Sequence, residues 1–356
     1  MTGPAAPGAV RTVLGDIPAD DLGACDYHEH LFQASPLLAG DELDDPEASG
    51  VEAALLRSAG IRALVEATPI GLGRNPEAVA RISAATGLQV VHVTGAHRQE
   101  HYADGHWILG ESEQALVARF RAEVQDGMTV RDTDRATDRT VVSTSRSAPV
   151  PEAQAARQRP YALGEPAHAR DPDGNPIRAG ALKAGIGYWR ISPFEGRVLT
   201  AVAVTAALTG AAVMVHLEFC SAAFEVLQRL TEHGLSADRI VLAHVDRNPD
   251  PGLHLELASQ GCYLGYDGMA RHRSAPDSAL LDCIGLVVAG GRADRVVLGG
   301  DVARRSRYIG YGGIPGLAYL PERFLPRLID RIGPELSSVL LRDNPARLLG
   351  MRPSKA

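Results

Sequence analysis

Short apolar runs alternate along the chain with longer segments in which apolar residues recur every three or four positions. The short runs predict strands at residues 25–30, 62–68, 89–94, 179–185, 212–217, 239–245, 262–266 and 295–300. The longer segments predict helices at residues 51–59, 76–86, 112–125, 195–209, 221–232, 251–259, 278–289 and 320–332. Eight strands alternating with eight helices predict an α/β fold, a TIM-type (β/α)8 barrel. A doubly wound sheet is the alternative, but it usually has a glycine-rich loop after its first strand, and this sequence has none there.

One segment, residues 129–178, interrupts the alternation. It is polar, contains several prolines and charges of both signs, and has no sustained period. We predict a long flexible insertion between the third helix and the fourth strand of a single domain spanning residues 1–356. Such an insertion would extend from the N-terminal face of the barrel. Because barrel enzymes use the opposite face, we expect it to take no part in catalysis.

The composition of the 356 residues is that of an ordinary globular protein, with 45% hydrophobic and 22% charged residues. The net charge of −7 argues against general binding to nucleic acids or anionic membranes. The sequence has neither a run of about 18 apolar residues nor a signal-peptide pattern, which predicts a cytoplasmic protein without a membrane span. The four cysteines are widely spaced, as expected for reduced thiols rather than a disulfide framework.

Lys183 is an unusual residue in this composition. Only two of the 36 lysine and arginine residues are lysines, and Lys183 lies in the middle of a short apolar strand. Because arginine supplies nearly all other positive charge, a lysine here suggests chemistry that needs an amine able to lose its proton. That amine could form a Schiff base or react with carbon dioxide to give a metal-binding carbamate. Alternatively, the side chain could lie along the sheet with its charged end in water.

Polar residues occupy the C-terminal ends of four other predicted strands. His28 and His30 are two residues apart and therefore face the same side of the first strand. His216, His244 and Asp301 end the fifth, sixth and eighth strands. A single buried histidine is usually a hydrogen-bonded core residue. Several histidines and a carboxylate that converge on one end of a barrel instead suggest metal ligands, because a buried charge is costly unless it is paired or metal-bound.

These side chains suit two divalent ions bridged by a carbamate on Lys183. Imidazole and carboxylate ligands are compatible with Zn, Mn, Fe, Co or Ni. The two expected sets of ligands are His28, His30 and Asp301 for one ion, and His216 and His244 for the other.

The order of these residues resembles the phosphotriesterase-related family of the amidohydrolase superfamily. The shared pattern is HxH in the first strand, lysine in the fourth, histidine in the fifth and sixth, and aspartate after the eighth. Residues 12–18 and 67–74 resemble the same family. The resemblance implies a (β/α)8 barrel with a binuclear centre, Zn as the favoured metal, a carboxylated Lys183, and ester hydrolysis by a metal-bridging hydroxide.

The resemblance also assigns catalytic roles. It implies that Asp301 takes the proton of the hydroxide and that Asp246, on the same strand face as His244, relays it. Family members that hydrolyse organophosphates have a histidine after the aspartate that ends strand seven. Here Gly268 follows Asp267, so the relay is incomplete, which argues against the interpretation as a phosphotriesterase.

The loops after strands seven and eight, residues 268–273 and 302–313, are rich in arginine. They favour an anionic group on the substrate, such as phosphate or carboxylate. Phospho-sugar lactonases of the family have basic and tyrosine residues in these loops, and Arg271, Arg304 and Tyr308 resemble them. We therefore predict a hydrolase that opens a phosphorylated sugar lactone, with these three residues binding the substrate.

Two alternatives remain at this point: a phosphotriesterase or other ester hydrolase, and a Schiff-base lyase that uses Lys183. The expected partner is a small anionic substrate, without nucleic acid or membrane, and a homodimer is possible by analogy. Residues after the third strand could also line the pocket, namely His97, Arg98, His101 and His106.

Overall fold

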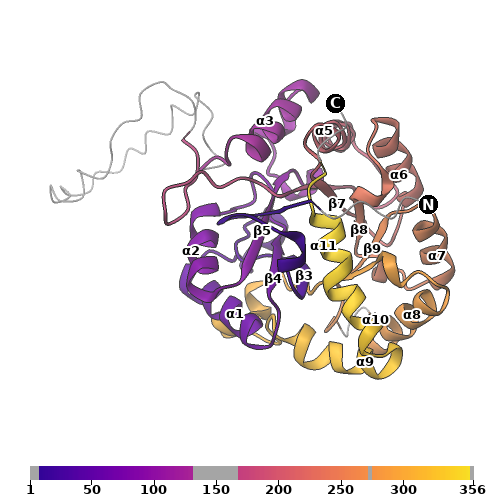
Figure 1. Ribbon diagram of the computed structural model, residues 1–356. Helices are drawn as coiled ribbons and strands as arrows, with labels where there is room; N and C mark the ends of the chain where they lie inside the picture. The colour runs from indigo at the N-terminus through magenta and orange to yellow at the C-terminus, as the bar shows by residue number, and fades with distance from the viewer. Residues whose placement is uncertain (1–7, 131–166, 272–274, 353–356) are drawn as a thin grey trace.

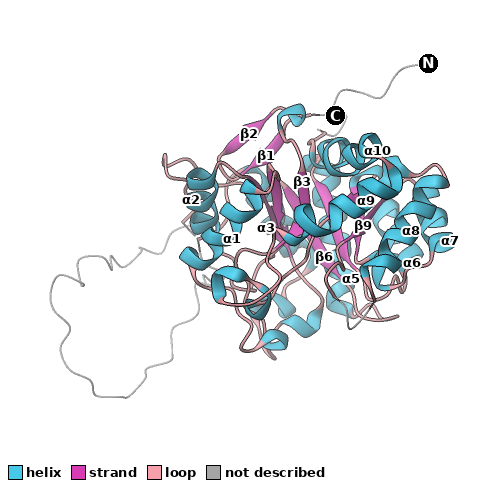
Figure 2. Ribbon diagram, turned by 90° about the horizontal axis from the view of Figure 1, so that it is seen from below, coloured by secondary structure: helices cyan, strands magenta, loops and turns pink. Residues whose placement is uncertain are grey.

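Eight parallel strands form the centre of the molecule (Figures 1 and 2). The computed structural model describes residues 8–130, 167–271 and 275–352. The central strands are β3 (Cys25–Glu29), β4 (Ala63–Glu66), β5 (Gln89–Gly95), β6 (Ala181–Gly185), β7 (Ala212–His216), β8 (Ile240–Ala243), β9 (Tyr263–Tyr266) and β10 (Val296–Leu298). They are paired in chain order, and the first and last are linked where the Asp301 N–H donates to the His28 carbonyl at 2.9 Å. The predicted barrel is confirmed.

Helices surround the strands on the outside (Figure 1). They are α1 (Pro46–Ser58), α2 (Pro76–Thr86), α3 (Glu113–Gln125), α5 (Pro193–Thr209), α6 (Ala223–Glu232), α7 (Pro251–Ser259), α8 (Asp277–Ala289), α9 (Leu325–Ile332), α10 (Pro334–Ser338) and α11 (Asn344–Leu349). Helix α1 begins earlier than predicted because the Asp45 side chain accepts the N–H groups of Glu47 and Ala48, and Pro46 takes the first helical position. No helix in the described part of the chain has both the length and the apolar character needed to cross a membrane.

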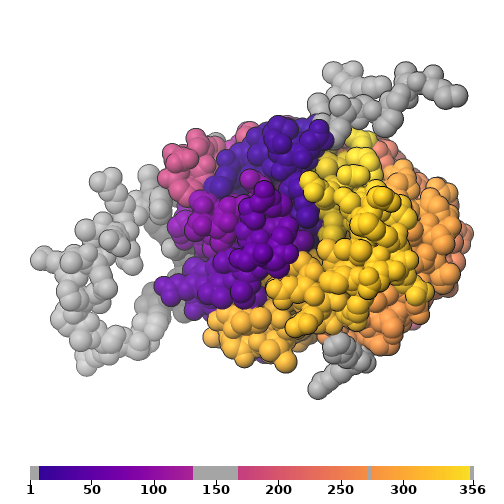
Figure 3. Space-filling model, turned by 60° about the horizontal axis from the view of Figure 1, so that its bottom comes forward, coloured from indigo at the N-terminus to yellow at the C-terminus, as the bar shows by residue number. Residues whose placement is uncertain are grey.

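The N-terminal end of the barrel is closed by two elements that the sequence did not predict. A hairpin of β1 (Val10–Thr12) and β2 (Gly15–Ile17) and helix α11 lie across this end (Figure 1). Val10, Leu348 and Leu349 are buried with the apolar side chains inside the barrel. The N- and C-terminal segments lie side by side on this face (Figure 3), and the Met351 N–H donates to the Ala9 carbonyl at 2.9 Å. The other end of the barrel is therefore the one open to ligands.

Most of the predicted insertion, residues 131–166, lies outside the described residues. Its described end is ordered rather than flexible: Ala169 and Ile177 are buried, and their backbones exchange hydrogen bonds with each other and with Met128. The Arg170 N–H donates to Glu77 in the first turn of α2 at 3.2 Å. This end of the insertion thus packs beside α2 and α3.

The four cysteines are free and buried, as expected for reduced thiols.

Candidate active site

A cavity of about 720 Å³ lies at the C-terminal ends of the strands. Most of the residues singled out from the sequence line it, and they come from five different βα units of the barrel. These residues are His28, His30, His216, His244, Asp246, Arg271, Asp301 and Arg304. The cavity is the expected position for an active site in this fold.

Lys183 lies below this cavity and is fully buried. Its Nζ is 3.1 Å from Nε2 of His28 and 3.1 Å from Sδ of Met214. Burial lowers the pKa of Lys183 to about 8, so a substantial fraction of the amine is neutral near physiological pH. The side chain does not reach water, which excludes the alternative in which the charged end is solvated.

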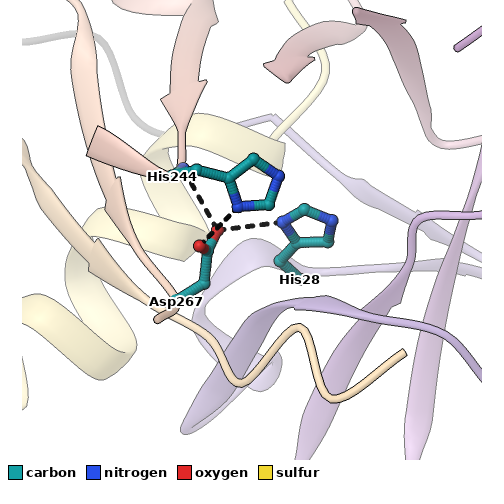
Figure 4. Close-up of side chains that lie close together, drawn as sticks. All are labelled: His28, His244 and Asp267. Carbon is teal, nitrogen blue, oxygen red and sulfur yellow. Dashed lines mark hydrogen bonds and ion pairs between the residues drawn. The ribbon is translucent and has the colours of Figure 1, made fainter. Parts of the chain in front are cut away.

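Asp267 holds two of the histidines from behind (Figure 4). Its carboxylate accepts hydrogen bonds from Nδ1 of His244 at 2.6 Å and from Nδ1 of His28 at 3.0 Å, and also from the hydroxyl of Tyr27. These bonds place the ring protons on Nδ1 and leave both Nε2 atoms available to a metal. His28, His244 and Asp267 are close enough to form a metal site by themselves, but the two short distances are hydrogen-bond lengths, so we interpret Asp267 as a supporting residue.

His30 is held in the same way by Thr68. The Thr68 hydroxyl donates to the Phe32 carbonyl at 2.6 Å and therefore accepts from Nδ1 of His30, at 2.7 Å. Burial lowers the pKa of His30 to about 4 and that of His244 to about 3, so both rings are neutral and able to bind a metal.

One group of predicted ligands fits a divalent ion directly. Oδ1 of Asp301 is 3.5 Å from Nε2 of His30 and 3.8 Å from Nε2 of His28. Ligand atoms around a tetrahedral ion with bonds of about 2.1 Å are about 3.4 Å apart, so little movement is needed to hold one. These three side chains form one of the two compact groups of potential ligands among the described residues.

His216 is held through its other ring nitrogen. Nε2 of His216 is 2.8 Å from Oε1 of Glu218, which leaves Nδ1 available to a metal. The His216 ring lies beside that of His244, with 4.5 Å between centroids. No compact group of three ligands in the described chain includes His216, so His216 and His244 would need a further ligand to hold an ion.

Asp301 is kept ionised. Burial would raise the pKa of its carboxyl group, but the Arg271 guanidinium, which donates to Oδ2, holds this pKa well below its usual range. The backbone of Asp301 is left-handed, with φ +41°, a conformation that residues other than glycine rarely adopt outside functional sites.

Asp246 is not on a strand face shared with His244, as the sequence had suggested. Strand β8 ends at Ala243, the backbone of His244 is left-handed with φ +63°, and Asp246 lies in a short 3-10 helix. Its Oδ2 accepts the N–H groups of Asp267 and Gly268, while its Oδ1 is buried without a partner among the described residues. Burial and the nearby Asp267 carboxylate raise the pKa of Asp246 to about 7.

The three residues predicted to bind substrate occupy different environments. Arg271 lines the cavity and is engaged with Asp301, and Arg304 lines the cavity mouth and pairs with Asp41 at 3.2 Å. Tyr308 is fully buried, and its hydroxyl donates to the carbonyl of His30. Its expected contact with substrate is therefore wrong, because the chain after β10 turns the ring into the core.

Three important residues were not assigned from the sequence: Asp267, Glu218 and Arg247. Asp267 follows β9 directly, the same signal that identified the metal ligands. Glu218 and Arg247 lie two and three residues beyond predicted ligands and line the cavity. Of the histidines after the third strand, His97 and His101 line the cavity, together with Arg98.

Comparisons with known proteins agree with this geometry. The sequence matches the Phosphotriesterase family over residues 8–142 and 168–349. It is 28% identical to a phospho-furanose lactonase of Mycoplasmopsis synoviae over 355 residues, covering 95% of this chain and 91% of the relative. The structure is similar to that of a lactonase from Listeria monocytogenes, with a TM-score of 0.79, 27% identity, and coverage of 97% of this chain and 100% of the other.

An amidohydrolase from Mycoplasma synoviae is also similar, with a TM-score of 0.82, 27% identity, and coverage of 98% of this chain and 93% of the other. The family match extends over most of the sequence, and the ligand geometry accords with it. The chain therefore belongs to the phosphotriesterase family, whose members are metal-dependent hydrolases of ester bonds.

Proposed function

We propose that this chain is a binuclear metal-dependent lactonase that opens a sugar lactone carrying a phosphate group. The observation that carries the proposal is the arrangement of the four histidines in one cavity with Asp301. Each histidine has one ring nitrogen tied by a hydrogen bond, to Asp267, Thr68 or Glu218, which leaves the other for a metal. The similarity to phospho-furanose lactonases supports the substrate class.

Lys183 would bridge the two ions as a carbamate. Its neutral amine adds to carbon dioxide, forms a new N–C bond and releases one proton. The lowered pKa supplies the neutral amine, and the fully buried position protects the product from water. A Schiff-base lyase would also use a neutral amine, but that chemistry does not need a set of four histidines and an aspartate arranged as metal ligands.

Bound divalent ions would supply a hydroxide at neutral pH and polarise the ester carbonyl. Asp301, kept ionised by Arg271, is suited to accept the proton of the nucleophile. As the ring C–O bond breaks, that proton passes to the leaving oxygen, and the product is an open hydroxy acid. Asp246 makes no hydrogen bond to Asp301 among the described residues, so a role as the next proton acceptor would require a bridging water.

Arginines give the cavity its preference for an anion. Four of them line it: Arg98, Arg247, Arg271 and Arg304. The Nε–H groups of Arg98 and Arg271 are buried and have no hydrogen-bond partner among the described residues. A phosphate or carboxylate on the substrate would supply acceptors for such donors.

Two measurements test the proposal. Metal analysis of protein purified without chelators should give two ions per chain. Activity should then be compared on a phosphorylated sugar lactone, the same lactone without phosphate, and a paraoxon-like triester. We expect the highest kcat/KM for the phosphorylated lactone. A higher value for the triester would favour a phosphotriesterase, and borohydride trapping of substrate on Lys183 in metal-free protein would favour a lyase.

A further inference from the structure

Glu218 connects a metal ligand to two arginines of the cavity wall. Its Oε1 is 2.8 Å from Nε2 of His216 and 3.3 Å from Nη1 of Arg98. Its Oε2 is 3.0 Å from Nη1 of Arg247. Arg98 and Arg247 follow strands β5 and β8, whereas His216 is the last residue of β7, and the Glu218 side chain is only 13% exposed. Glu218 is thus a single carboxylate on which three βα units of the barrel converge.

The contact with His216 has a chemical consequence. An imidazole ring can bind a metal only through a nitrogen that carries no proton. A carboxylate next to Nε2 holds the proton there, so His216 presents Nδ1, whereas Asp267 and Thr68 make the other three histidines present Nε2. Without Glu218, the proton of His216 would be free to occupy either nitrogen and the ring would be free to turn.

The two arginines fix Glu218 in turn. A glutamate side chain has several rotatable bonds, and holding it in one orientation costs conformational entropy. Arg98 and Arg247 approach the carboxylate from two sides and oppose its rotation away from His216. Both guanidinium groups are largely buried, so these ion pairs are less screened by solvent than those of exposed residues.

We propose that Glu218 is a positioning residue for the metal centre, and that Arg98 and Arg247 act on the metal through it. The chain of action runs from the arginines to Glu218, from Glu218 to His216, and from His216 to the ion. The inference rests on the proposed binuclear centre. It gives the two arginines a role before any substrate binds.

This role predicts a change in metal affinity that is opposite in sign to the change expected from the Coulomb interaction alone. Removing a positive charge near a cation site should strengthen metal binding if only the Coulomb interaction matters. If Arg247 acts by holding Glu218, the variant Arg247→Gln should weaken metal binding instead.

The experiment measures zinc retention without any substrate. Zinc-loaded protein is mixed with increasing concentrations of a chelator. The amount of zinc that remains bound gives the affinity of the protein for each of the two ions. We expect Glu218→Ala to weaken the binding of one of the two ions about 10- to 100-fold, the usual range for residues that orient a metal ligand. Glu218→Gln retains an oxygen that can accept the His216 proton, so its effect should be several-fold smaller. Arg98→Gln and Arg247→Gln should each weaken the same ion about threefold or more.

Two matched variants control for charge. Arg304→Gln removes a cavity arginine that pairs with Asp41 rather than Glu218, and it should not weaken zinc retention. Glu225→Gln removes an exposed carboxylate from α6 whose one ion pair among the described residues is with Arg229, and it should also retain zinc as the wild type does. The ¹⁵N chemical shifts of the His216 ring give a second measurement. They should report a proton on Nε2 in the wild type and a mixture of protonated forms in metal-free Glu218→Ala.

The outcomes separate this inference from the proposed function. Glu218→Ala that retains both ions within twofold of the wild type would overturn the role of Glu218. Arg98→Gln and Arg247→Gln that bind zinc as tightly as the wild type, or more tightly, would overturn the role of the arginines. Failure of every lactone to be hydrolysed, with the expected zinc results, would overturn only the proposed substrate.

Discussion

Asp267 offers the most direct test of how the metal centre is held. The variant Asp267→Asn keeps the shape of the side chain but replaces one carboxylate oxygen with an NH2 group. In the wild type the two oxygens accept from Nδ1 of His28 at 3.0 Å and from Nδ1 of His244 at 2.6 Å. An amide can accept from only one of them, so the other histidine must face a donor or move its proton to Nε2, the atom needed by the metal.

The expected cost is that of one hydrogen bond to a charged group, about 1.5–3 kcal/mol. Since about 1.4 kcal/mol corresponds to a factor of ten, zinc affinity should fall about ten- to hundredfold. Competition with a chelator measures this affinity directly. Asp294→Asn is the control, because Asp294 is exposed and, in the part of the chain that the structure describes, forms an ion pair with the neighbouring Arg295 alone. Zinc affinity of Asp267→Asn within twofold of the wild type would refute the view that Asp267 fixes the ring protons.

Three further predictions follow from individual residues. Lys183→Ala should lose metal and activity, and both should recover partly when a short carboxylate is added. Lys183→Arg should lose both without recovery, because a guanidinium forms no carbamate. Metal analysis with and without propionate distinguishes the two variants. Tyr308→Phe should lower the free energy of unfolding by about 1 kcal/mol, because the buried carbonyl of His30 loses its donor. The same variant should leave KM unchanged. Urea unfolding measures the change in stability, and steady-state kinetics measure KM. Burial opposes ionisation of Glu123, but its bidentate pair with Arg74 lowers its pKa from 4.5 to about 2. The pair therefore stabilises the fold fully above pH 4.5, and this contribution is lost as the pH falls towards 2. Glu123→Gln should therefore be less stable at neutral pH and show a shallower loss of stability between pH 4.5 and 2 in urea unfolding; a slope equal to that of the wild type would contradict this.

The barrel could be predicted because its strands are buried on both faces. In β6 and β7 every residue is buried, so each appears in the sequence as an apolar run interrupted only by a site residue. Strand β3 is equally buried, although Asp26, His28 and Glu29 interrupt its apolar residues. The closing elements could not be predicted in this way. Strands β1 and β2 have three residues each, too few to show a period, and their burial depends on α11 at the other end of the chain.

Residues beyond the strand ends were harder to place. The alternation of side chains that correctly paired His28 with His30 does not continue past β8, because the left-handed backbone of His244 redirects the chain before Asp246. Tyr308 follows a 3-10 turn after β10, and only the three-dimensional path of that loop shows that its ring enters the core. Side-chain direction in such loops depends on dihedral angles that residue type alone does not specify.

The distinction between a ligand and its support is also set by geometry rather than by residue type. Asp267 and Asp301 are both aspartates at the C-terminal end of a barrel strand, and from the sequence either could bind a metal. Asp267 contacts the Nδ1 atoms of His28 and His244 at hydrogen-bond distance, whereas Asp301 faces the Nε2 atoms of His28 and His30 at the spacing expected across an ion. Asp267 therefore decides which nitrogen each ring presents, and Asp301 shares the ion that those nitrogens bind. The ligand motif alone would not be sufficient to make a metal site if transferred to another barrel, because the ring protons would then be free to occupy the nitrogens that the metal needs.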